Sequence, residues 1–216
     1  MKPNNTPGRR SRLPRTFYSG PDTIGIARRL LGKLLVTKSN SGAITSGMIV
    51  ETEAYCGVED RAAHSFGGRR TKRNEVTFGP AGHLYVFFVY GMYHQLNIVT
   101  GPEGFPHVVL VRAVEPIEGI DVIITRRGEL PDKDLTSGPG KLCIALDIDR
   151  SLNGLDVVKS ERVWVEDFRT FGNAEIAVGP RVGIDYAGPD VDRPWRFWVK
   201  DSVFVSKTRR ARAPKG

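Results

Sequence analysis

The sequence contains little cysteine and no long apolar run. Its 216 residues include two cysteines, Cys56 and Cys143. Two cysteines cannot supply a four-cysteine zinc or iron–sulfur site, and a domain of this length does not need disulfide bonds. No apolar stretch approaches the roughly 20 residues that span a bilayer, and none follows the basic N-terminus as a secretory signal requires. We therefore expect a cytoplasmic chain without a membrane segment, close to the nucleoid if the source is prokaryotic.

Acidic residues are scarcer than basic ones. Lys and Arg number 32 against 24 Asp and Glu, which gives a formal net charge of +8. Such an excess favours a polyanionic partner, either nucleic acid or an anionic membrane surface, although some soluble proteins are merely basic. The hydrophobic fraction of 40% and the charged fraction of 26% are ordinary for a globular protein, and the length suits one domain.

Basic residues gather at both ends of the chain. We expect residues 1–15 and 207–216 to be disordered when free, because they carry charge and few apolar side chains. They can track phosphates or simply keep the protein soluble. This predicts one domain over residues 16–206, between a basic arm and a basic tail. The basic residues in these segments are Lys2, Arg9, Arg10, Arg12, Arg15, Lys207, Arg209, Arg210, Arg212 and Lys215.

The pattern of apolar residues predicts an α+β fold. Asp22 is a suitable N-cap for a helix that ends near Leu31. The segments 34–38 and 44–53 suggest a hairpin, as do 84–90 and 93–99 around a Gly91-Met92 turn. We expect a single domain with a curved antiparallel or mixed sheet, surrounding helices and one protruding hairpin. Further elements are expected at 107–114 (strand), 117–127 and 139 onward (helices), 163–166, 176–178, 182–184, 195–200 and 203–207 (strands).

Two carboxylates follow the apolar run 47–50. A carboxylate at the end of a buried strand costs free energy unless it is paired, hydrogen-bonded or used, and this applies to Glu51 and Glu53. Alternatively, the two residues share the solvent face of an edge strand. Arg112 interrupts another apolar strand, so it must reach solvent or find a carboxylate, for which Glu53 is the natural partner. That contact could also be a purely structural ion pair.

Aromatic residues crowd the hairpin at 84–99. Alternation along a strand sends Tyr85 and Phe87 to one side and Phe88 and Tyr90 to the other. Tyr90 would therefore stand exposed near the tip of the hairpin. An exposed aromatic residue in that position is either chance or a wedge.

Three motifs resemble one known family. They are ETEAYxGxEDxAAHSxxGRRTxRN from residue 51, LYVxxxYGMYxxxNI from residue 84, and SGPGKLC from residue 137. The chain resembles the alkyladenine (3-methyladenine) DNA glycosylases of the type without a helix-hairpin-helix motif, from about residue 17 to residue 206. The resemblance implies an enzyme that flips a damaged purine out of duplex DNA and hydrolyses its N-glycosidic bond. Lesions of the 3-methyladenine, hypoxanthine and ethenoadenine class are the implied substrates.

The resemblance implies roles for the residues of these motifs. Glu53 would activate the water together with Arg112, while strand alternation alone leaves Glu51 as an alternative base. Tyr90 would fill the gap that the flipped base leaves in the stack. Asn97 would crowd the 2-amino group of guanine, or else form an ordinary side-chain hydrogen bond. The residues expected to wall the base pocket are Tyr55, His64 and Phe87, the last at a position where the family can carry tyrosine.

Two basic motifs suggest phosphate contacts. A glycine-rich loop carries clustered cations that either clamp phosphates or are simply solvated. In the segment 136–141, Thr136 or Ser137 would cap a helix with Pro139 in its first turn, so its amides and Lys141 would form an anion site. This segment lacks the spacing of a Walker motif. The clustered cations of the loop are Arg69, Arg70, Lys72 and Arg73.

The sequence implies neither a metal nor another cofactor. The four histidines, at 64, 83, 94 and 107, lack a zinc-ligand spacing, and no lysine lies in a recognisable catalytic context. We therefore predict a monofunctional hydrolase in base excision repair. Its partner would be double-stranded DNA with damaged purines, without a membrane or an obligate protein partner, and the chain would act as a monomer. Two alternatives remain, a non-catalytic nucleic-acid-binding module and a hydrolase of free nucleosides.

Overall fold

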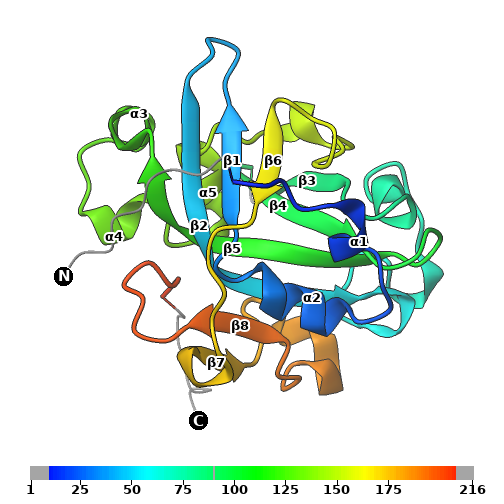
Figure 1. Ribbon diagram of the computed structural model, residues 1–216. Helices are drawn as coiled ribbons and strands as arrows, with labels where there is room; N and C mark the ends of the chain where they lie inside the picture. The colour runs from blue at the N-terminus through cyan, green and yellow to red at the C-terminus, as the bar shows by residue number, and fades with distance from the viewer. Residues whose placement is uncertain (1–9, 90, 208–216) are drawn as a thin grey trace.

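A curved antiparallel sheet organises the molecule (Figure 1). The computed structural model describes residues 10–89 and 91–207. Its strands follow the order β3-β4-β5-β2-β1-β6, and β8 pairs with both β2 and β7. The strands are β1 (Leu34–Lys38), β2 (Ile44–Cys56), β3 (Leu84–Val89), β4 (Tyr93–Thr100), β5 (His107–Glu118), β6 (Val163–Glu166), β7 (Ile176–Gly179) and β8 (Arg196–Val199).

Short helices surround this sheet, so the predicted α+β class is confirmed. Helix α2 packs on β2 and β5, and α5 packs on β4 and β5. The α-helices are α1 (Arg15–Tyr18), α2 (Thr23–Leu30), α3 (Ile120–Arg127), α4 (Asp132–Leu135) and α5 (Pro139–Ala145). The 3-10 helices are η1 (Gly57–Glu59), η2 (Phe66–Gly68), η3 (Glu75–Phe78), η4 (Arg150–Leu152), η5 (Asn173–Glu175) and η6 (Asp185–Asp190). No helix in the described part of the chain is long and apolar enough to cross a membrane.

The two faces of the sheet have different neighbours. Leu96 and Ile98 of β4 face the main core, which they share with Leu30 of α2 and Leu142 of α5. The alternate residues of β3, β4 and β5 form a second cluster on the other face. Strand alternation therefore gives one face to the helices and leaves the other for a cavity. The buried members of the second cluster are Tyr85, Phe87, Val99 and Val108.

Several predicted elements are confirmed by the structure. Asp22 caps α2, since its Oδ1 accepts a hydrogen bond of 2.7 Å from the amide of Gly25. The hairpins β1–β2 and β3–β4 form, and their registers pair Leu34 with Met48 and Tyr85 with Asn97. Figure 1 shows the β1–β2 turn rising clear of the rest of the molecule.

Other predicted elements are wrong. Strand β5 continues to Glu118, which pairs with Ser46, so the expected helix over 117–127 begins only at Ile120, after the left-handed Gly119 (φ 69°). The segments 182–184 and 203–207 are not strands. Their amides at Val182 and Ser206 donate to side-chain carboxylates instead of a neighbouring strand. A sequence pattern cannot distinguish these two uses of an amide.

The chain ends were expected to form a basic arm and a basic tail. Residues 1–9 and 208–216 lie outside the described residues. Residues 10–15 lie against the domain: the amide of Leu13 donates to the carbonyl of Val165 at 2.9 Å, and the Leu13 side chain is buried. The guanidinium of Arg12 lies 4.6 Å from the centre of the Trp164 ring.

Candidate active site

A cavity of about 170 Å³ opens over the second face of the sheet. That is far more than the roughly 10–15 Å³ that a single water molecule needs. Its lining comes from β5, from the β3–β4 hairpin and from residues of the segments 62–65 and 182–186. The residues predicted to wall the base pocket all line it, namely Tyr55, His64, Phe87 and Asn97, and so does the predicted catalytic residue Arg112.

Irregular pairing between β2 and β5 aims charged side chains at this cavity. Ile49 pairs with Val114, Glu51 with Ala113, and Thr52 with Val111. Val50 on β2 and Arg112 on β5 are therefore extra residues in two bulges that compensate one another. Bulges re-aim side chains, and they are over-represented next to active sites. They explain why Arg112 meets both acidic residues of one strand.

Glu51 and Glu53 are both fully buried, with 0% exposure. Strand β2 is a central strand, with β5 on one side and β1 and β8 on the other. The interpretation that the two glutamates share the solvent face of an edge strand is therefore wrong. The cost of burying both carboxylates is offset by partners from several elements.

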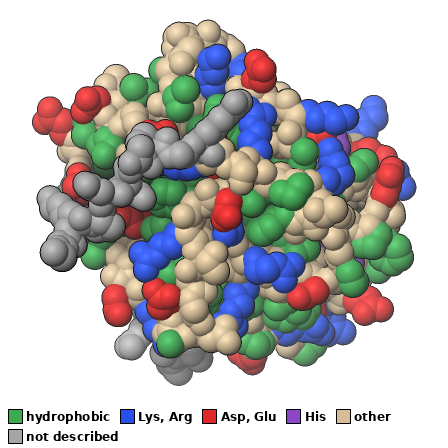
Figure 2. Space-filling view, in the orientation of Figure 1, with side chains coloured by type: hydrophobic (Ala, Val, Ile, Leu, Met, Phe, Trp, Pro, Cys, Tyr) green, Lys and Arg blue, Asp and Glu red, His purple; other side chains and the backbone are tan. Residues whose placement is uncertain are grey.

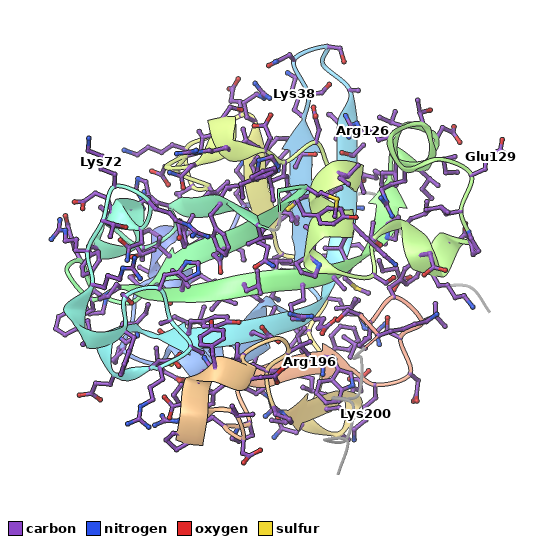
Figure 3. The ribbon with its side chains drawn as sticks, turned by 180° about the vertical axis from the view of Figure 1, so that it is seen from behind. Lys38, Lys72, Arg126, Glu129, Arg196 and Lys200 are labelled. Atoms are coloured by element: carbon purple, nitrogen blue, oxygen red, sulfur yellow. The ribbon has the colours of Figure 1, made fainter. Side chains whose placement is uncertain are left out.

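Glu51 is held by partners from β5, from β8 and from the segment around Ser206. Its Oε1 accepts from the Nε atoms of Arg112 (2.9 Å) and Arg196 (2.7 Å), and from the Ser206 hydroxyl (2.8 Å). Its Oε2 accepts from the Ser206 amide at 2.7 Å. Each carboxylate oxygen offers about two lone-pair positions, so Oε1 is fully engaged and Oε2 has one partner. Of the residues that hold Glu51, Arg112 lines the cavity, whereas Arg196 and Ser206 do not. Figure 3 shows Arg196 within the body of the molecule rather than at its edge.

Glu53 lies behind three residues of the cavity wall. Its Oε1 accepts from the Val182 amide at 2.7 Å and lies 3.2 Å from NH1 of Arg112. Its Oε2 accepts from the Tyr55 hydroxyl at 2.9 Å. Burial raises the pKa of Tyr55 well above its ordinary value, and the Glu53 charge adds to this effect. Tyr55 is therefore a neutral hydrogen-bond donor to the carboxylate.

Arg112 joins the two glutamates. Burial opposes its charge, but the carboxylates of Glu53 and Glu51 outweigh burial and raise the pKa of Arg112 above its ordinary value. Arg112 also donates from NH2 to the Ser206 hydroxyl at 3.2 Å. All three guanidinium nitrogens thus have a partner, which fixes the orientation of the group.

Aromatic rings line the rim of the cavity. The His64 and Phe87 ring centres lie 4.6 Å apart, and His64 Nδ1 lies 2.8 Å from the Tyr85 hydroxyl. His64 keeps exposed surface, but partial removal from water lowers its pKa from 6.5 to about 4, with Arg73 and then Arg69 adding to the shift. His64 is therefore neutral at pH 7.

Asn97 lies on the floor of the cavity with 3% exposure. Its Nδ2 donates to the carbonyl of Tyr85 at 3.3 Å, on the strand with which it pairs. The ordinary side-chain hydrogen bond is therefore present, and the same side chain also faces the cavity. The two interpretations of Asn97 are compatible.

Sequence reasoning missed the ion pair that supports Tyr55. Arg181 is fully buried with Asp60, and their atoms pair twice, at 2.5 and 2.8 Å. The Arg181 guanidinium lies 4.7 Å from the centre of the Tyr55 ring. This pair fixes the segment that carries the Val182 amide. Asp60 could have indicated this pair, because it lies inside the motif that resembles the family. Nothing near Arg181 in the sequence indicated that its side chain is buried.

The predicted phosphate-binding residues differ in their surroundings. Arg69 and Arg73 line a second hollow, which shares His64 and Tyr186 with the first cavity. Arg70 is paired with Glu75 at 2.6 Å. Figure 3 shows Lys72 pointing outward at the edge of the molecule.

Helix α5 begins differently from the prediction. Its N-cap is Gly138, with Pro139 at the first helical position, so the expected capping by Thr136 or Ser137 is wrong. Lys141 lies 3.2 Å from Asp134 and donates to the Ser137 hydroxyl at 3.3 Å.

The surface charges are mixed in sign. Figure 2 shows that Lys and Arg are interspersed with Asp and Glu on the visible face.

Tyr90 lies outside the described residues, which resume at Gly91.

In residues 10–89 and 91–207, no three His, Cys, Asp or Glu side chains gather where they could hold a metal ion. The groups that line the cavity include aromatic rings, two side-chain amides and one guanidinium. They can stack on a flat ring and place charge beside it.

Comparisons with known proteins agree with this chemistry. A family model described as methylpurine-DNA glycosylase matches residues 16–203. Proteins named "Putative 3-methyladenine DNA glycosylase" are similar over most of the chain. The one from Bacillus cereus (strain G9842) is 48% identical, covering 90% of this chain and 98% of its own length. Those from Clostridium acetobutylicum and Methanocella arvoryzae are 47% and 50% identical, covering 92% and 90% of this chain and 99% and 96% of their own.

Proposed function

The chain belongs to the methylpurine-DNA glycosylase family and is a DNA glycosylase that acts on damaged DNA, and we propose its lesions and its mechanism. The enzyme flips 3-methyladenine, hypoxanthine or ethenoadenine out of duplex DNA and hydrolyses the N-glycosidic bond, leaving an abasic site. It acts in the cytoplasm as a monomer. The observation that carries this proposal is the buried Glu53, held by Arg112, Tyr55 and Val182 behind an aromatic cavity.

Glu53 is the proposed base because every residue that holds it lines the cavity. These residues are Tyr55, Val182 and Arg112, and the Oε2 atom of Glu53 has one partner, so it keeps a lone pair for water. Glu51 is held mainly by Arg196 and Ser206, which do not line the cavity. Because Glu53 has no exposed surface, the water enters through a shift of Tyr55 or of the segment 182–184. The Glu53 carboxylate then stabilises the positive charge that develops on the sugar, and it takes the proton of the water as the water attacks.

The aromatic rings of the cavity hold the extruded purine. Tyr55 stacks on one side of the base, and His64 and Phe87 contact it from the other. Phe87 packs against the Tyr85 ring at 4.9 Å, so stacking there requires no hydroxyl. Asn97 crowds the 2-amino group of guanine and so keeps normal guanine out.

The remaining assignments concern the duplex itself. Tyr90 occupies the gap left in the base stack. Arg69 and Arg73 bind phosphates beside the rim of the cavity, and Lys72 binds farther along the backbone. Arg70 and Lys141 reach phosphates only after leaving Glu75 and Asp134, so we assign them smaller contributions.

A lesion panel tests this function against its alternatives. Duplex oligonucleotides with hypoxanthine or ethenoadenine, and methylated duplex DNA for 3-methyladenine, are incubated with the protein, alongside the free nucleosides. We expect abasic sites and released bases from the duplexes only. Release from free nucleosides at the same rate would indicate a nucleoside hydrolase, and tight lesion binding without release would indicate a non-catalytic module.

A further inference from the structure

Gln95 is an unpartnered amide in the cavity. It lies on β4, pairs in register with Phe87 on β3, and is half-buried in the cavity wall. Its side chain makes no hydrogen bond with any residue of 10–89 or 91–207. A half-buried amide without a partner costs free energy unless water or a ligand satisfies it.

The position of Gln95 follows from the strand register. Gln95 and Asn97 are two residues apart on β4, so their side chains share one face, separated by about 6.8 Å along the strand. Asn97 pairs with Leu110 on the antiparallel strand β5, so Gln95 lies in the direction of Arg112. The two amides therefore lie side by side with the rings of Tyr85 and Phe87 on the face of the sheet that borders the cavity.

We propose that Gln95 is a specificity-determining residue that binds the substituent at C6 of the extruded purine. This inference rests on the proposed function, in which Asn97 faces the substituent at C2. The 2- and 6-positions are the two ends of the Watson–Crick edge, so a purine with its 2-position at Asn97 presents its 6-position to Gln95. The proposal adds a contact to the reaction and no chemical step.

An amide suits two classes of lesion at this position. Its oxygen accepts a hydrogen bond from the 6-amino group of 3-methyladenine, and its NH₂ group donates to the 6-oxygen of hypoxanthine. Rotation about the last side-chain bond exchanges these two atoms. Gln95 thus explains how one rigid cavity accepts both classes. It does not reject normal adenine, whose exclusion rests on the higher cost of unpairing an undamaged base.

Two substitutions separate the donor from the acceptor. Gln95→Glu supplies only acceptors, so we expect excision of hypoxanthine to fall by about tenfold or more relative to 3-methyladenine. Gln95→Met keeps the length without polar atoms, so both lesions should be excised more slowly and by similar factors. Single-turnover rates are measured on a hypoxanthine duplex and on methylated duplex DNA, from which released 3-methyladenine is quantified by chromatography.

His94→Ala is the matched control. His94 belongs to the same strand, but its ring contacts Phe88 at 5.1 Å on the other face, so the ratio of the two rates should equal that of wild type. An unchanged ratio in Gln95→Glu, with wild type excising both lesions, overturns the role of Gln95 alone. If Gln95→Glu does not fold, Gln95→Met decides, since wild-type rates on both lesions would overturn the proposal. Wild-type protein that excises neither lesion overturns the proposed function and this inference together.

Discussion

At the residue scale, two glutamates on one strand differ because of their partners. Both are buried and both contact Arg112. Glu51 is otherwise held by Arg196 and Ser206, whereas Glu53 is otherwise held by Tyr55 and the Val182 amide beside the cavity. The sequence motif indicated Glu53, but strand alternation alone left the choice open. What distinguishes the two is whether their partners line the cavity, which depends on residues far away in the chain.

The first prediction compares these two carboxylates. Glu53→Gln should bind lesion DNA as wild type does and lose about 10²–10⁴-fold in excision rate, because the general base is removed. Glu51→Gln should instead lower the free energy of unfolding by about 3–5 kcal/mol, because it disturbs a buried pair. Single-turnover excision and urea denaturation measure the two effects. Near-wild-type excision by a folded Glu53→Gln, together with loss in Glu51→Gln, would assign the base to Glu51.

The second prediction concerns the pH dependence of stability. The pKa of His64 falls from 6.5 to about 4 on folding, so the unfolded chain binds more protons between these values. The contribution of His64 to stability is therefore complete above pH 6.5 and is lost as the pH falls toward 4. Urea denaturation across this range should show a shallower decline in His64→Gln than in wild type. Equal declines in both proteins would contradict the lowered pKa.

At the element scale, periodicity predicted regular elements better than irregular ones. Helix α2 and the two hairpins follow directly from apolar spacing and turn residues. The bulges at Val50 and Arg112 leave no signal in the composition of either strand, yet they create the site. The segments around Val182 and Ser206 have the composition of strands, but their amides are used by Glu53 and Glu51. The sequence therefore predicted residues that line the cavity without predicting what holds them.

The third prediction tests the segment around Ser206. Its hydroxyl donates to Glu51 and accepts from Arg112, so it ties the end of the described chain to the site. Ser206→Ala should lower the free energy of unfolding by about 1–3 kcal/mol, because charged partners lose a hydrogen bond. It should also slow excision, because Arg112 loses one of its three fixed contacts. Urea denaturation and single-turnover excision are measured together.

Ser160→Ala provides the control for that substitution. Ser160 is also buried, and its hydroxyl accepts from the amides of Arg162 and Val163, but it does not line the cavity. It should lose stability and keep its rate of excision per folded molecule. Equal slowing in both variants would mean that general loss of stability explains the effect of Ser206→Ala.

At the scale of the whole molecule, the basic residues behind the net charge of +8 differ in whether they can reach DNA. Arg112, Arg181 and Arg196 are buried with carboxylates and cannot bind DNA phosphates. Arg69, by contrast, has no ion pair among the described residues and lines the hollow that adjoins the cavity. Composition alone therefore predicted a polyanionic partner, while the three-dimensional structure indicates which cations remain free to meet it.

The fourth prediction follows from that availability. Each phosphate contact contributes about 0.9 to the slope of log K against log salt concentration, because counterions are released. Arg69→Gln should therefore weaken binding to any duplex and reduce this slope by about 0.9. Lys200→Gln removes the same charge at a surface site where Nζ donates to the carbonyl of Ala174, and it should leave the slope unchanged. Fluorescence anisotropy on undamaged and lesion-containing duplexes, titrated over salt concentration, gives both slopes. If the two variants lose the same slope, net charge alone drives binding, and the hollow beside the cavity is not a phosphate site.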